Sequence, residues 1–216
     1  LAPRQAKCVS KLESEHWESV TAETVDISQP YWCELPSGKR IALFFYHGDL
    51  AMEVAFRGAL NNGEAFAHRI LDICKSLPDE RLLHFATDGE TYGHHHRYGE
   101  MAMAYCFETL DKMDGVEPIN YAAYLHRFPP THRVQIHERS SWSCVHGVGR
   151  WSENCGCVID PQRKGFQKWR VHLRKALNRL RDTTRTLFLE NCYKLVEDPY
   201  VLRNGWLEAT LQNETE

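Results

Sequence analysis

Short apolar runs that alternate with segments of helical spacing constrain this chain most. Arg40–Tyr46 and Arg81–Thr87 are strand-length and largely apolar, as is typical of strands in a parallel sheet that helices cover. Glu64–Leu77 and Gly99–Lys112 carry apolar side chains at helical spacing. The alternation of predicted strands and helices along the chain predicts an α/β fold. We expect a partial (β/α)7-type barrel with parallel strands, followed by a C-terminal helical segment. In such folds the functional residues follow the carboxyl ends of the strands.

The remaining elements are less regular. We expect residues 1–30 to be irregular, strands at Tyr31–Leu35 and Arg133–His137, and helices at Leu50–Arg57 (capped by Asp49) and Ile119–Arg127. The apolar and basic residues of Phe166–Val196 predict a long amphipathic helix or a helical hairpin, whose basic face is solvated. We therefore predict two domains, the barrel portion over 1–160 and the start of a helical domain over 161–216.

Composition narrows the class of protein. The 216 residues suffice for one substantial domain, and a net charge of −3 favours neither a nucleic acid nor a membrane surface as partner. Five isolated cysteines predict buried thiols in a reducing compartment, so we expect a cytoplasmic protein: Cys8, Cys33, Cys74, Cys106 and Cys192. The chain opens with Leu-Ala-Pro, which we interpret as a start inside a larger protein.

The segment Asp88–His96 is the richest in chemistry. It follows the predicted strand Arg81–Thr87 and gathers two carboxylates (Asp88 and Glu90), a phenol, three imidazoles and two glycines. A carboxylic acid beside another carboxylate keeps its proton to higher pH, which suits a general acid. One alternative is that Asp88 only caps a helix and that the histidines are solvated. Another is a divalent-cation site of Asp88 with His94, His95 and His96, in which His94 and His96 have the spacing of a ligand pair on a strand. We predict no metal and no cofactor.

Asp88-Gly89-Glu90-Thr91-Tyr92-Gly93-His94-His95-His96 resembles the fourth conserved region of glycoside hydrolase family 57, the amylase, glucanotransferase and branching-enzyme group. The closest likeness is to the subgroup with an attached domain of unknown function. Further segments are similar to that subgroup: Leu1-Ala2-Pro3, Gln5-Ala6, Leu35-Pro36-Ser37-Gly38, Phe44-Phe45-Tyr46, Leu60-Asn61-Asn62-Gly63-Glu64 and Ser141–Trp151.

The resemblance implies a retaining glycosidase or transglycosidase acting on an α-glucan-like oligo- or polysaccharide. Asp88 would be the general acid/base, and Glu90 would tune it or bind a sugar hydroxyl. The family's nucleophile Glu lies on an earlier strand, which we expect in a missing N-terminal half of the polypeptide, so this portion alone should be inactive. The subgroup has an Asp after Phe-Phe-Tyr where this chain has His47, which leaves a non-catalytic carbohydrate-binding or regulatory protein as the alternative.

A second cluster of interest lies in the loop Glu138–Cys157. Trp142 and Trp151 offer flat apolar faces on which sugar rings stack, or else they anchor the loop in the core. With them we assign substrate binding to a set of further side chains: His47, Tyr92, His94, His95, His96 and His146. Cys144, Cys155 and Cys157 with His146 are a possible zinc site, but their spacing lacks a Cys-x-x-Cys pair, so we favour a disulfide or plain thiols.

Overall fold

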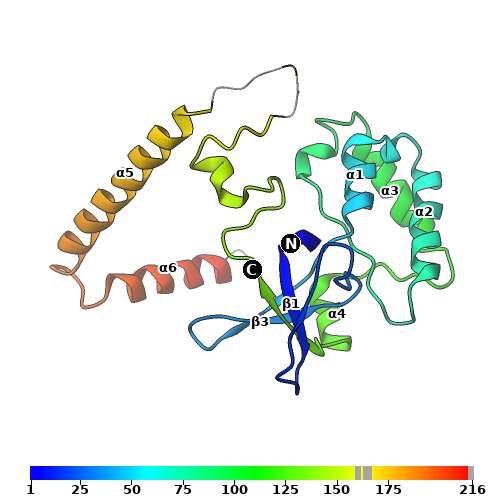
Figure 1. Cartoon of the computed structure of the whole chain (residues 1–216), viewed down its shortest axis with the longest axis horizontal. Coiled ribbons are helices and arrows are strands. Elements are labelled where there is room, and N and C mark those ends of the chain that lie inside the picture. The colour runs from blue at the N-terminus through cyan, green and yellow to red at the C-terminus, as the bar shows by residue number, and fades with distance from the viewer. Residues whose placement is uncertain (159–161, 163–166, 214–216) are drawn as a thin grey trace. The chain divides into compact units, whose positions relative to one another are not determined.

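A computed structural model describes residues 1–158, 162 and 167–213 (Figure 1). The chain divides into two compact units, Leu1–Val145 and His146–Glu216. Each unit is described by itself. The predicted domain boundary at 160/161 lies outside the described residues.

A five-stranded mixed sheet forms one part of the first unit. Its strands are β1 (Ala6–Lys11), β2 (Glu18–Ser19), β3 (Tyr31–Glu34), β4 (Arg40–Leu43) and β5 (His132–Ile136), in the order β2-β1-β5-β3-β4. Only the β3–β5 pair is parallel, with Tyr31 opposite His132, while the other three pairs are antiparallel. The fold is therefore mixed α/β, as predicted in class, but the sheet is not closed into a barrel.

Three predictions for the strands are wrong. Residues 1–30 are not irregular throughout, because they contain β1 and β2. Arg40–Tyr46 is not a strand buried on both faces: β4 is an edge strand in an antiparallel hairpin with β3, so Ile41 is 49% exposed, and only Phe45 beyond its end is fully buried. Arg81–Thr87 is not a regular strand.

The segment Arg81–Thr87 nevertheless runs beside neighbouring backbone. The Leu82 amide donates to the carbonyl of Ser28 (3.0 Å), and the His84 carbonyl accepts from the amide of His47 (2.8 Å). These two hydrogen bonds go to different segments, so they fix Arg81–Thr87 in place but do not form the repeated pairing of a β-sheet. The run Leu82 to Phe85 is therefore fixed before the loop that follows it.

The helices of the first unit agree closely with the predicted ranges. They are α1 (Gly48–Phe56), α2 (Gly63–Ser76), α3 (Gly99–Leu110) and α4 (Tyr121–Arg127). The cap of α1 is His47 rather than Asp49, since its Nδ1 accepts from the Leu50 amide (3.2 Å). Asn62 caps α2 through its Oδ1, which accepts from the Ala65 amide (3.0 Å).

Two apolar cores hold this unit together. The helices α1, α2 and α3 lie together (Figure 1) around Leu50, Val54, Phe66, Ala67 and Cys106, each at most 2% exposed. The sheet has its own core, formed by Ala6, Val25, Tyr31, Cys33, Phe45 and Val134. Three side chains between Leu82 and His96 pack against the helical core, namely Leu83, Phe85 and Tyr92.

The second unit is mostly helical. A 3-10 helix, η4 (Gly147–Trp151), precedes the long α5 (Trp169–Cys192) and then α6 (Pro199–Asn213). The predicted amphipathic segment is thus one long helix whose start is Trp169; residues 163–166 lie outside the described residues. No helix in the described part of the chain is long and apolar enough to cross a membrane.

Candidate active site

The segment Asp88–His96 forms a tightly hydrogen-bonded loop. A 3-10 helix, η3 (Gly89–Thr91), begins after Asp88, whose carbonyl accepts from the Thr91 amide (3.0 Å). The amides of His95 and His96 then donate back to the carbonyls of Glu90 (2.9 Å) and Thr91 (3.1 Å). These backbone contacts define the turn of the loop.

Three side chains of this loop point inward and anchor it. Thr91 is 4% exposed. The hydroxyl of Tyr92 lies 2.8 Å from Thr87 Oγ1, and His96 Nε2 lies 2.8 Å from the Ala55 carbonyl oxygen on α1. Tyr92 and His96, which we assigned to substrate binding, therefore have structural partners within the protein.

Four other side chains of the loop are exposed. They are Asp88, Glu90, His94 and His95, and the two adjacent imidazoles meet edge to face with ring centroids 4.9 Å apart. The side chain of Asp88 makes no capping hydrogen bond to η3, so the alternative role as a helix cap has no support from its geometry. Asp88, His94 and His96 are not among the residues whose ligand atoms converge in the described part of the chain.

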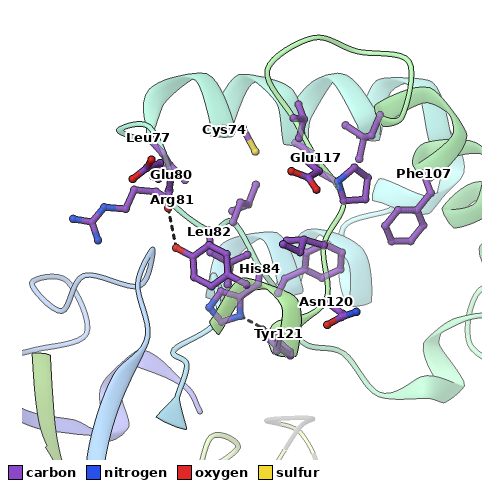
Figure 2. Close-up of a pocket in the computed structure, with 18 of the residues that line it drawn as sticks. Cys74, Leu77, Glu80, Arg81, Leu82, His84, Phe107, Glu117, Asn120 and Tyr121 are labelled. Atoms are coloured by element: carbon purple, nitrogen blue, oxygen red, sulfur yellow. Dashed lines mark hydrogen bonds between the residues drawn. The ribbon is translucent and has the colours of Figure 1, made fainter. Parts of the chain in front are cut away.

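A cavity of about 970 Å³ lies beside this loop, between α2, α3 and α4 (Figure 2). Tyr92 lines it, but Asp88 and Glu90 do not. The cavity is walled mainly by apolar side chains, and Figure 2 shows His84 and Tyr121 side by side in it, with His84 Nδ1 3.0 Å from the Tyr121 hydroxyl. The predicted catalytic carboxylates and this cavity are therefore separate features.

His84 is a buried, titratable side chain of this cavity that the sequence pattern did not single out. It is 8% exposed, and burial lowers the pKa of its imidazole to about 4, so the ring is neutral near neutral pH. Its Nε2 has no hydrogen-bond partner among the described residues. The only sequence signal was its position inside the apolar run Arg81–Thr87.

The protein-family comparison decides the identity of the first unit. Residues 12–137, more than half of the chain, match the family described as glycosyl hydrolase family 57. The chain belongs to glycosyl hydrolase family 57. Residues 166–216 match a domain of unknown function, DUF3536, and no curated protein matches the chain.

Membership of glycosyl hydrolase family 57 implies a glycoside hydrolase or transglycosidase with a carbohydrate substrate. The family match ends at residue 137, so Trp142 and Trp151 lie beyond it. Trp142 in the first unit is 58% exposed and Trp151 in the second is 46% exposed. Exposure of this size fits a surface contact better than a core anchor.

His146 has different neighbours from the other predicted site residues of this family 57 chain. Its Nδ1 lies 3.3 Å from Cys157 Sγ, so the ring contacts a cysteine sulfur. His47 is also engaged, since its ring caps α1.

Proposed function

We propose that this chain supplies the general acid/base of a retaining family 57 site that acts on an α-glucan-like oligo- or polysaccharide, with Asp88 in that role. The family match supports the reaction class. The observation that carries the assignment is the side chain of Asp88, which is exposed and makes no cap contact in a loop fixed by backbone hydrogen bonds.

The reaction needs two carboxyl groups about 5–5.5 Å apart. Asp88 first protonates the leaving glycosidic oxygen while the nucleophile attacks the anomeric carbon. It then removes a proton from the water, or from the acceptor hydroxyl, that releases the glycosyl group. In this proposal the nucleophile is the glutamate that the resemblance to family 57 implies.

The exposed neighbours of Asp88 complete the proposed site. Glu90, His94 and His95 present acceptors and donors that suit sugar hydroxyls. Tyr92 and His96 act through the loop, because their polar atoms contact Thr87 and Ala55. Thr91 fixes the same loop from its buried position.

The test compares two leaving groups in the polypeptide that contains this chain and the nucleophile. Asp88→Asn should lower kcat/KM for an unactivated α-glucan by about 10²–10⁴-fold, because proton donation is lost. It should lower kcat/KM for α-glucosyl fluoride far less, because fluoride leaves without a proton. Asp72→Asn, an exposed carboxylate on α2, is the control. Equal losses on both substrates, or no loss, would contradict the assignment.

One observation favours a second candidate, a non-catalytic carbohydrate-binding protein. His47 stands where the resembling subgroup has an Asp, and its ring serves as a helix cap. Calorimetry with maltooligosaccharides separates the candidates: binding that Trp142→Ala abolishes, with no turnover by the full polypeptide, would support binding alone. Turnover that depends on Asp88 would exclude it.

We also propose that the protein works in the cytoplasm. The reason is the state of Cys8, Cys33, Cys74, Cys106 and Cys192, which are unpaired thiols. Unpaired, partly or fully buried thiols are usual in reducing compartments. Fractionation of the source cells, with the protein recovered outside the cytosol, would contradict this.

A further inference from the structure

We propose that Cys144, His146, Cys155 and Cys157 bind a structural zinc ion. One ligand atom from each of the four residues lies within 4.8 Å of every other. Zinc–sulfur and zinc–nitrogen bonds of about 2.3 and 2.0–2.1 Å place tetrahedral ligands roughly 3.5–3.8 Å apart. His146 Nδ1 and Cys157 Sγ, 3.3 Å apart, already have nearly this separation. The four groups therefore need only a small contraction to surround one ion.

The backbone of this segment brings distant ligands together. The ligands come as two close pairs, Cys-x-His and Cys-x-Cys, separated by η4. Gly156, between Cys155 and Cys157, has a φ of +76°, a left-handed conformation that residues with a side chain rarely adopt. A Cβ at Gly156 would meet no atom within 4 Å, so the glycine serves the turn itself.

The surroundings of the four ligands also suit a bound metal. Gln167 is 6% exposed, and its Nε2 donates to the carbonyl of Cys157 (2.6 Å). Arg170, on the first turn of α5, donates to Gln167 Oε1 (2.9 Å) and to the Arg150 carbonyl (2.8 Å). Its Nη1 lies 4.0 Å from Cys155 Sγ. Three thiolates and one Zn²⁺ leave a net charge of −1, which the Arg170 guanidinium offsets.

The ligand set selects the metal and its role. Three cysteines and one histidine are a soft tetrahedral set that zinc prefers over calcium, magnesium or manganese. Four protein ligands leave no open position for water or substrate, so the ion is structural. It would fix the segment between Cys144 and Cys157 and, through Gln167 and Arg170, the start of α5. This role is independent of the chemistry proposed for Asp88.

The first experiment measures metal content and ligand geometry in the full chain. Protein purified in reducing buffer without chelator should carry one zinc per chain by elemental analysis. Replacement with Co²⁺ should give visible bands of a tetrahedral site and near-ultraviolet thiolate charge-transfer bands. Metal-free protein that takes up no Co²⁺ would overturn the proposal. So would a denatured mass two hydrogens below the fully reduced mass, because a disulfide would then hold two of the ligands.

Variants assign the ligands. Cys155→Ser and Cys157→Ser should each lower zinc affinity at least tenfold, while the control Cys192→Ser, on α5, should leave it unchanged. His146→Cys should keep the zinc and shift the Co²⁺ bands to those of four thiolates, which guards against a variant that loses metal only because it misfolds. Gln167→Ala, which removes an outer contact, should weaken zinc binding about 10–100-fold. Unchanged affinity in both serine variants would overturn the assignment.

Discussion

His96 on the candidate active-site loop lies 2.8 Å from the Ala55 carbonyl oxygen, through its Nε2. A carbonyl oxygen only accepts, so Nε2 carries the proton and the imidazole donates. The two residues are 41 positions apart in the sequence. This hydrogen bond joins the loop that presents Asp88 to the last turn of α1.

Replacing His96 should cost more stability than replacing its neighbour. His96→Ala leaves the Ala55 carbonyl without its donor, and we expect a loss of about 1–2 kcal/mol in the free energy of unfolding. His94→Ala changes an exposed side chain and should stay within about 0.5 kcal/mol. Urea denaturation of both variants makes the comparison, and equal losses would show that the Ala55 contact contributes nothing.

The Tyr92–Thr87 hydrogen bond should behave as a coupled pair. Both groups are partly buried with 2.8 Å between their oxygens. Tyr92→Phe and Thr87→Val each remove one partner, and the double variant removes both. We expect a coupling energy of about 0.5–1.5 kcal/mol in the unfolding cycle. Strictly additive losses would argue against the bond in solution.

A side chain at Gly63 should be poorly tolerated. A Cβ there would lie 2.7 Å from the Ala102 carbonyl oxygen and 3.1 Å from Tyr105 Cδ1, where α2 crosses α3. Because backbone must move to relieve this contact, Gly63→Ala should lower the free energy of unfolding by about 1–3 kcal/mol. Gly48→Ala on α1 is the matched control, since a Cβ there meets nothing within 4 Å. A neutral Gly63→Ala in thermal unfolding would contradict the close approach.

His84 should make stability depend on pH. Its pKa is about 4 in the folded protein, below the usual 6.5 of the unfolded chain. Between these values only the unfolded state takes up the proton, so stability is full above about pH 6.5 and falls as the pH drops toward 4. The slope is about 1.4 kcal/mol per pH unit.

His84→Gln tests this dependence because glutamine does not titrate. Between about pH 4 and pH 6.5, the free energy of unfolding should depend on pH more steeply in the parent than in the variant, by close to 1.4 kcal/mol per pH unit. His94→Gln, at an exposed position, serves as the control and should leave the slope unchanged. Parallel slopes for the parent and His84→Gln would show that the imidazole does not carry the effect.

Helices were predictable from the sequence because their apolar spacing is local. The ranges for α2 and α3 needed only residues within each helix. Strand pairing is not local, and Arg40–Tyr46 has the same composition whether it becomes a central or an edge strand. The inward residues of β1 include Ala6, Cys8 and Ser10, which are too small or too polar to mark a strand.

The candidate site was likewise predictable only where its features are local in the sequence. Composition was enough to single out Asp88–His96, but it did not separate exposed groups from anchors. That separation depends on Thr87 and on Ala55, which is far away in the sequence. For the cysteines, spacing alone favoured thiols or a disulfide. Only the folded chain brings the ligand atoms of Cys144, His146, Cys155 and Cys157 together.

The place of β5 in the sheet has a consequence for the order of folding. The hairpin β3–β4 and the pair β1–β2 each form from residues that are close in the sequence. The two pairs join into one sheet only through β5, which lies between them and is the last of the five strands to be synthesised. The cluster of α1, α2 and α3 has no such requirement, since contacts between close residues form sooner than distant ones. On a ribosome we therefore expect the helical half to gain structure first, and the two ribbons to stay apart until Val134 emerges. Pulse-labelling hydrogen exchange that protected β1 and β3 before α2 would contradict this order.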